Sequence, residues 1–223
     1  MTTKKKLTFS PLVKLGLPLT GGITVGLLLL LLFVKLAEDL LYQELGTFDA
    51  VVENFIRGFT SEGLTRVAIF VTNLGSAAVE ISLLLVVGGF LYFRLKHIWE
   101  PVILTSSLAG GWILNEALKA IFHRSRPSIQ HLVEVGGYSL PSGHAMVSAA
   151  FYGMLGYLLW VNMRKNSKPA WYVVLSTFVL IFAIGLSRIY LGVHFASDVL
   201  AGFAAGGAWL IACIIALHCL TRN

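Results

Sequence analysis

Three short polar stretches interrupt an otherwise apolar chain, and they hold the residues that could do chemistry. They are KAIFHRSRP at 119–127, PSGH at 141–144 and SRIYLGVHFASD at 187–198. Lys119, Arg126 and Arg188 supply three cations from positions far apart in the sequence. Guanidinium groups bind phosphate through paired hydrogen bonds and a lysine adds a point charge, so these residues together suit a phosphate group.

The PSGH stretch adds donors of another kind. Pro141, Ser142 and Gly143 are typical of the start of a helix, whose first N–H groups can bind an anion, and Ser142 adds a hydroxyl. No dense cluster of carboxylates stands near the three stretches, so a divalent metal would find few oxygen ligands. We therefore expect a phosphate site with no metal and no other cofactor, in which the cations neutralise charge that develops during phosphoryl transfer.

Two histidines can carry the covalent and proton-transfer steps. His194 and Asp198 are four residues apart, which places them on one side of a helix. A carboxylate beside an imidazole fixes its tautomer and leaves the other nitrogen free, so His194 is the better candidate nucleophile. His144 has no such partner in the sequence and stands beside the expected anion site. It suits a general acid for the leaving oxygen and then a general base for water.

Each stretch also has a structural interpretation. Lys119 and Arg126 are acceptable as residues that extend from a span to the membrane interface, and Glu116 can neutralise Lys119 one helical turn away. PSGH can be a plain helix start, and His194 with Asp198 a structural hydrogen bond. Together these interpretations require three unrelated coincidences at one membrane level. The sequence leaves open the roles of Glu80, Glu116, His123, Arg124 and His131.

The elements that must position these residues are membrane helices. The chain is 57% hydrophobic and only 13% charged, whereas soluble domains carry about a quarter charged residues. Its Lys and Arg residues stand mostly at the ends of apolar runs, which excludes a nucleic-acid partner as the reason for the net positive charge. We predict an all-α bundle of six spans, at about 15–36, 77–95, 99–121, 143–163, 170–190 and 195–219.

The distribution of Lys and Arg predicts the orientation of this bundle. More of them stand at the ends that share a side with the N-terminus, so we expect both termini in the cytoplasm and the three polar stretches at the extracytoplasmic face of the plasma membrane. The first apolar run is long enough to span and no cleavage site follows it, which favours a retained signal anchor. We expect one domain over residues 1–223.

The segment between the first two spans predicts two short helices on the outer surface. Apolar residues recur at helical spacing in an acidic segment, which favours an amphipathic helix with Asp49 as its cap. These residues are Phe48, Val51, Val52, Phe55, Ile56 and Phe59. A second helix is expected from Ser61 to Gly75. The acidic side chains are expected to form a solvated face.

The three stretches in this order resemble the signature of the type 2 phosphatidic acid phosphatase superfamily, in its membrane branch. The matching residues are Lys119-x6-Arg126-Pro127, Pro141-Ser142-Gly143-His144 and Ser187-Arg188-x5-His194-x3-Asp198. The resemblance implies a metal-independent phosphatase that forms a phosphohistidine at His194, held by Asp198, with His144 protonating the leaving group. It implies that phosphate is bound by Lys119, Arg126, Ser142, Gly143 and Arg188.

The resemblance also implies the substrate class. Because the motifs stand at helix ends, we expect a lipid phosphate or diphosphate whose phosphate lies at headgroup depth while its tail stays in the membrane lipid. Undecaprenyl diphosphate fits an outward-facing site, phosphatidylglycerophosphate is the second candidate and phosphatidic acid the third. The alternatives are a transporter or flippase that binds lipid phosphates without hydrolysing them, and a structural membrane subunit. The oligomeric state is not predicted.

Overall fold

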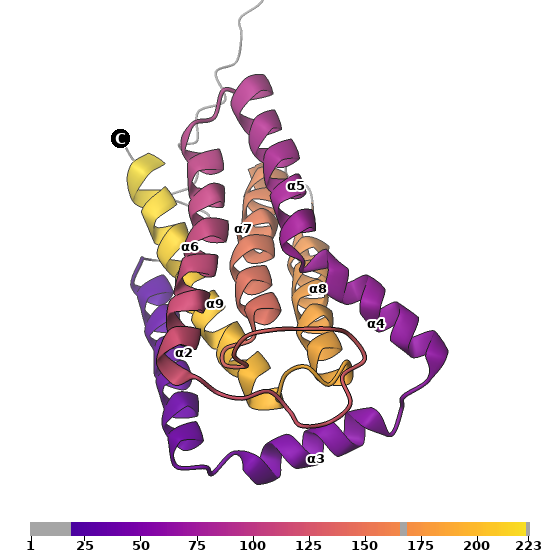
Figure 1. The fold of residues 1–223 in the computed structure, drawn as a ribbon. Helices are drawn as coiled ribbons and strands as arrows, with labels where there is room; N and C mark the ends of the chain where they lie inside the picture. The colour runs from indigo at the N-terminus through magenta and orange to yellow at the C-terminus, as the bar shows by residue number, and fades with distance from the viewer. Residues whose placement is uncertain (1–18, 166–168, 222–223) are drawn as a thin grey trace, which may run out of the picture.

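The computed structural model describes residues 19–165 and 169–221, and within those ranges the chain forms helices and loops but no strand (Figure 1). The helices are α2 (Leu19–Leu41), α3 (Gly46–Arg57), α4 (Glu62–Leu74), α5 (Ala77–Gly89) continued by the π-helix η1 (Phe90–Arg94), α6 (Trp99–Phe122), α7 (Gly143–Lys165), α8 (Trp171–Tyr190) and α9 (Ala196–Thr221). The all-helical prediction is confirmed for these residues.

Five helices of the described chain are long and apolar enough to cross a membrane, which makes this a multi-pass membrane protein. They are α2, α5 with η1, α7, α8 and α9. Helix α6 is 24 residues long but less apolar, and it is not among the five. Helix α2 ends at Leu41, five residues beyond the predicted end at 36, while the predicted start at 15 lies outside the described residues.

Helix α7 is the centre of the bundle. It packs against α6, α8 and α9, and α9 packs in turn against α2. The core between these helices contains Leu104, Phe151, Met154 and Ile184, all fully buried. Helices α7 and α9 pack closely at Gly206, where a methyl group would come 2.2 Å from the carbonyl oxygen of Met146.

Helices α3 and α4 connect the first span to the second. Helix α3 lies across one end of the bundle, and α4 returns from it toward α5 (Figure 1). Helix α4 matches its predicted bounds, since the Ser61 side chain accepts a hydrogen bond from the Leu64 N–H and Gly75 follows the last turn. The expected cap at Asp49 is wrong. Helix α3 begins at Gly46, after Leu45, and Asp49 is a buried residue of its first turn that bonds to another helix.

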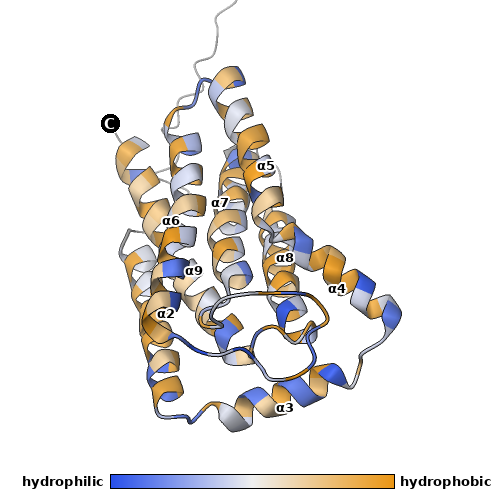
Figure 2. Cartoon of the chain, viewed as in Figure 1, coloured by the Kyte–Doolittle hydropathy of each residue, from blue (hydrophilic) through white to orange (hydrophobic). Residues whose placement is uncertain are grey.

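The loop between α6 and α7 arches over the same end of the bundle as α3 (Figure 1). Colouring by hydropathy places apolar residues along most of the spans, with polar ones at this end of α7, α8 and α9 (Figure 2). The three polar stretches of the sequence meet here. Lys119 is in the last turn of α6, His144 in the first turn of α7, Arg188 in the last turn of α8 and Asp198 in the first turn of α9.

Candidate active site

His194 lies in the turn before α9 and Asp198 in the first turn of that helix. Their side chains are close, as the spacing predicts, although His194 is not itself in the helix. The Nδ1 atom of His194 is 3.6 Å from Oδ2 of Asp198, and both side chains are buried. The same Oδ2 accepts hydrogen bonds from the Phe195 N–H at 2.9 Å and from the Ser139 hydroxyl at 2.5 Å. The carboxylate therefore has a fixed orientation toward the Nδ1 edge of the imidazole.

Arg126 lies against the opposite side of the His194 ring. Its Nη1 atom is 3.2 Å from Nε2 of His194 and donates to the Val193 carbonyl at 2.7 Å. A guanidinium can only donate, so Nε2 is the acceptor and the ring proton belongs on Nδ1, toward Asp198. This tautomer leaves a lone pair on Nε2, which is the atom that a nucleophilic histidine needs free.

The pKa of His194 is lowered to about 4, mainly by burial; Asp198 opposes this shift, and the nearby Arg188 and Arg126 add to it. The imidazole is therefore neutral at neutral pH. Burial also lowers the pKa of Arg126, although Asp198 opposes that shift. An arginine stays charged in proteins, so Arg126 remains a cation beside a neutral histidine.

At the end of the bundle where the three polar stretches meet, two buried polar atoms have no hydrogen-bond partner among the described residues. They are Oγ of Ser142 and Nε of Arg188. Arg188 is otherwise held through its Nη1 atom, which donates to Oγ1 of Thr72 in α4 at 2.8 Å. Leaving such a group unpaired costs about 1–3 kcal/mol, and more when it is charged. Phosphoryl oxygens would satisfy both a hydroxyl and a guanidinium N–H.

The start of α7 lies beside the end of α6. Asn115 donates to the Pro141 carbonyl at 3.2 Å, and a methyl group at Gly143 would come 3.0 Å from Oδ1 of Asn115 and 3.7 Å from Nζ of Lys119. Only a glycine allows this approach without a shift. The Ser142 N–H donates to the Asp198 carbonyl at 3.1 Å, so backbone donors to phosphate would have to come from the residues after it.

His144 faces the same group of charges. The charged or titratable side chains that interact electrostatically with His144 are Arg188, His194, Lys119 and Arg126. Lys119 is also paired, since its Nζ donates to Glu116 at 2.9 Å. The structure thus brings the nine candidate site residues to one end of the bundle: Lys119, Arg126, Pro141, Ser142, Gly143, His144, Arg188, His194 and Asp198.

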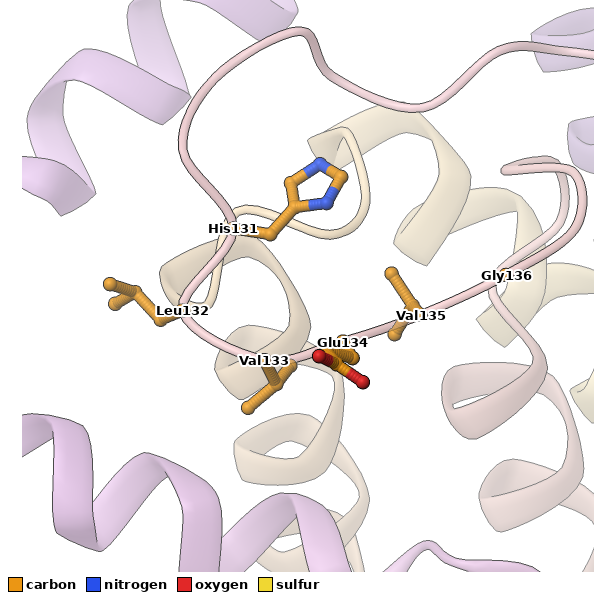
Figure 3. A pocket seen from close by; sticks show the side chains of 6 residues that line it. All are labelled: His131, Leu132, Val133, Glu134, Val135 and Gly136. Atoms are coloured by element: carbon orange, nitrogen blue, oxygen red, sulfur yellow. The ribbon is translucent and has the colours of Figure 1, made fainter.

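The loop between α6 and α7 frames an open pocket of about 800 Å³ with residues 131–136 (Figure 3). His131 and Val135 point into the space that the loop encloses, and Leu132 points away (Figure 3). The His131 Nε2 atom lies 2.9 Å from the Pro127 carbonyl. The Leu132 N–H donates to the Leu191 carbonyl at 3.0 Å, which ties the loop to the turn that carries His194.

Three residues whose roles the sequence leaves open make structural contacts: Glu80, His123 and Arg124. Glu80 is fully buried in α5 and accepts a hydrogen bond from Ser148 at 3.0 Å. His123 ends α6 in the left-handed conformation and packs edge-on against Tyr138 with ring centres 4.5 Å apart. Arg124 bonds to Asp198, a contact that spacing could not reveal because 74 residues separate them.

In the described part of the chain, no three side chains among His, Cys, Asp and Glu gather as a metal site would require. What gathers is a set of cations around a neutral imidazole, with a carboxylate behind it. Such a set can bind a phosphoryl group, attack phosphorus and stabilise the charge of the transition state. The fold and this site define a membrane-embedded enzyme for phosphoryl transfer.

The comparison with protein families gives the same class. The profile of the PAP2 superfamily matches residues 100–222, which include all three polar stretches. Phosphatidylglycerophosphatase B of Bacillus subtilis (strain 168) is 30% identical over 178 residues, which is 80% of this chain and 87% of the relative. Lipid phosphate phosphatase gamma of Arabidopsis thaliana is 28% identical over 128 residues, 54% of this chain and 55% of that protein. The chain belongs to the PAP2 superfamily and is a phosphatase.

Two solved structures resemble the fold. The crystal structure of a transmembrane PAP2-type phosphatidylglycerolphosphate phosphatase from Bacillus subtilis matches with a TM-score of 0.80 and 28% identity, covering 85% of this chain and 94% of that one. The structure of Aquifex aeolicus LpxE matches with a TM-score of 0.60 and 24% identity, covering 74% and 93%. The second match is evidence for the fold alone.

Proposed function

We propose that this protein hydrolyses the terminal phosphate of a membrane lipid phosphate or diphosphate through a phosphohistidine, without a metal. One observation carries the proposal. The Nε2 atom of His194 faces Arg126 at the end of the bundle where Ser142 Oγ and Arg188 Nε are buried and have no hydrogen-bond partner among the described residues. A phosphoryl group placed there would meet a nucleophile and donors at once.

The proposed reaction has two steps. The Nε2 lone pair of His194 attacks phosphorus, the bond from phosphorus to the leaving oxygen breaks, and that oxygen takes a proton from His144. His144, now neutral, takes a proton from water, whose oxygen attacks the phosphohistidine and releases inorganic phosphate. Asp198 keeps the proton on Nδ1 of His194 and stabilises the cationic ring. Lys119, Arg126 and Arg188 neutralise the equatorial oxygens, the role that a metal has in other phosphoryl transferases.

The lipid substrate is supported by the relatives and by the position of the site. The relatives are named for phosphatidylglycerophosphate and lipid phosphate. The site stands at the ends of spans, where a phosphate headgroup can reach it while the tail stays in the bilayer. The proposed site residues would bind phosphate and leave the tail unspecified, so we propose phosphatidylglycerophosphate, undecaprenyl diphosphate and phosphatidic acid as the substrates to compare.

We propose that α6 is the sixth span, which makes a single six-span domain with α3 and α4 at the extracytoplasmic surface. Both termini would then be cytoplasmic and the active site would face outward. The test uses a chain in which Cys213 and Cys219 are replaced by alanine. A membrane-impermeant maleimide should label Glu134→Cys in intact cells and should label Arg94→Cys only after lysis. The opposite pattern would reverse the orientation.

Phosphate release by purified protein in detergent tests the activity. The three lipids are offered with and without EDTA, to wild type and to His194→Ala, with His218→Ala at the far end of α9 as the matched histidine control. We expect wild type and the His218→Ala control to release phosphate in EDTA, and His194→Ala to release none. Binding of the lipids without release by wild type would instead favour the transporter or flippase.

A further inference from the structure

The guanidinium of Arg124 joins two carboxylates that come from opposite ends of the sequence. Its Nη1 atom donates to Asp198 Oδ1 at 2.5 Å and to Ser197 Oγ at 2.8 Å. Its Nη2 atom donates to Asp49 Oδ2 at 2.8 Å. The Arg124 side chain is 14% exposed, and both carboxylates are buried. Paired hydrogen bonds of this kind need the planar fork of an arginine.

Asp49 fixes the arrangement from α3. Its Oδ1 accepts the Ser197 N–H at 2.9 Å, and its Oδ2 accepts the Ser197 hydroxyl at 2.7 Å. This is a carboxylate at the start of α9, where it satisfies a free N–H and suits the helix dipole. The guanidinium carbon of Arg124 lies over the Phe195 ring, 4.1 Å from the ring centre. The plane of the guanidinium is therefore held on one face and along two edges.

The consequence falls on Asp198, which divides its two oxygens between separate partners. Oδ1 accepts from Arg124, whereas Oδ2 accepts from Ser139 and the Phe195 N–H and faces Nδ1 of His194. A carboxylate free to rotate would present either oxygen to the ring. The bond to Arg124 prevents this rotation and partly neutralises the charge that His194 meets.

We infer that Arg124 and Asp49 are positioning residues for the proposed reaction: through Asp198 they set the tautomer and the basicity of His194, while neither touches the substrate. This inference rests on the proposed function only for its kinetic test, because the state of His194 is measurable without substrate.

Several charged and titratable groups face His194, and a test has to keep them unchanged. They are Asp198 from α9, Arg188 from α8, His144 from α7 and Arg126 from the loop. Arg124 hydrogen-bonds to Asp198, Ser197 and Asp49, so its replacement acts on His194 chiefly through Asp198. A purely structural clamp between α3 and α9 would lower thermal stability and leave the titration of His194 in place.

The experiment compares Arg124→Gln, Arg124→Lys and Asp49→Asn. Arg57→Gln is the matched control, since Arg57 is an arginine of α3 whose partner is Glu53 at 4.0 Å, away from the site. Two measurements are made on each variant in detergent. The pKa of His194 is read from NMR spectra of protein with isotope-labelled histidine, assigned by comparison with His194→Gln. The pH dependence of kcat/KM and the separate kcat and KM are read from phosphate release.

We expect the pKa of His194 to shift in opposite directions in Arg124→Gln and Asp49→Asn. Arg124→Gln leaves the Asp198 charge uncompensated, so the pKa of His194 and the acid limb of kcat/KM rise by about one unit, with kcat at least tenfold lower and KM unchanged. Asp49→Asn removes a negative charge and moves the pKa of His194 slightly downward. Arg124→Lys keeps the charge and the wild-type titration, but kcat falls severalfold because an ammonium cannot span both carboxylates.

Two results would overturn the inference. One is a His194 titration in Arg124→Gln and Asp49→Asn that matches Arg57→Gln. The other is a higher KM with unchanged kcat in Arg124→Gln, which would make Arg124 a substrate contact. If Arg124→Gln does not fold, the titration criterion applies to Asp49→Asn and the KM criterion applies to Arg124→Lys. A wild type inactive on every lipid would reject the proposed function, and the NMR titration would still decide the positioning.

Discussion

Arg126 Nη1 lies 3.2 Å from Nε2 of His194, on the side of the ring away from Asp198. The guanidinium therefore contacts the very nitrogen that is proposed to attack phosphorus. Its other N–H groups donate to the carbonyls of Gly136, Gly137 and Tyr138. A phosphate that takes the N–H from Nε2 would free the lone pair for attack at the moment of binding.

The pH profile of kcat/KM should have an acid limb far below the ordinary pKa of histidine. Burial lowers the pKa of His194 to about 4. The neutral ring is the nucleophile, so activity from this group is present above that pKa and is lost as the pH falls through it. We expect this limb near pH 4, rather than near the unperturbed value of about 6.5. Phosphate release at constant ionic strength measures it, and a limb from His194 near 6.5 would contradict the burial argument.

The same shift predicts a loss of stability in acid. The folded state binds the His194 proton less tightly than the unfolded state, so unfolding takes up a proton between the two pKa values. The contribution of His194 is fully present above the unfolded pKa and falls as the pH drops from about 6.5 toward 4. Thermal unfolding of wild type and His194→Gln over this range measures it. Parallel curves for the two proteins would contradict the prediction.

Alanine replacements of two buried serines, Ser142 and Ser139, should affect substrate binding and protein stability separately. Ser142 Oγ has no partner among the described residues, so Ser142→Ala loses no hydrogen bond of the substrate-free protein. We expect its free energy of unfolding to stay within about 0.5 kcal/mol of wild type while KM rises about tenfold or more. Ser139 donates to Asp198, and Ser139→Ala should lower the unfolding free energy by about 1–2 kcal/mol.

Denaturation and steady-state kinetics of these two alanine variants form one experiment. Each variant is the control for the other, because both side chains are fully buried and of the same size. A KM for Ser142→Ala equal to that of wild type would remove Ser142 from the phosphate site.

A pair of adjacent glycines tests the packing that positions the site. A methyl group at Gly206 would come 2.2 Å from the backbone oxygen of Met146, whereas one at Gly207 would come 3.0 Å from the end of the flexible Leu29 side chain. Backbone cannot move aside cheaply, so Gly206→Ala should destabilise by about 1–3 kcal/mol and reduce kcat, as overpacking does. Gly207→Ala should have a small effect. Equal melting temperatures for the two variants would contradict the close contact of α7 and α9.

Much of this architecture could be predicted from the sequence because the bilayer leaves few choices. Apolar runs of span length predict helices, and the ends of α5 with η1 and of α6 through α9 fall within two residues of the prediction. The spacing of His194 and Asp198 also predicts a local contact, since four residues make about one helical turn. The limits of α4 could also be predicted, because Ser61 and Gly75 are residue types that commonly flank a helix.

The contacts made across the bundle could not be predicted in this way. Asp49 has the sequence position of a helix cap in a polar segment, yet it is buried against Ser197, 148 residues away. Ser139 has no spacing that relates it to Asp198, and neither does Thr72 to Arg188. Such pairs depend on how helices from distant parts of the chain meet, and a single sequence carries no periodicity for that.

The most direct measurement is the capture of a phosphoenzyme. Purified wild type is mixed with a lipid phosphate labelled with ³²P in its terminal phosphate, quenched after a few milliseconds and separated from lipid, alongside His194→Ala. We expect label on wild type that survives alkali and is lost in mild acid, as in a phosphoramidate, and no label on His194→Ala. Turnover with no labelled protein, or label that persists in His194→Ala, would contradict a phosphohistidine at His194.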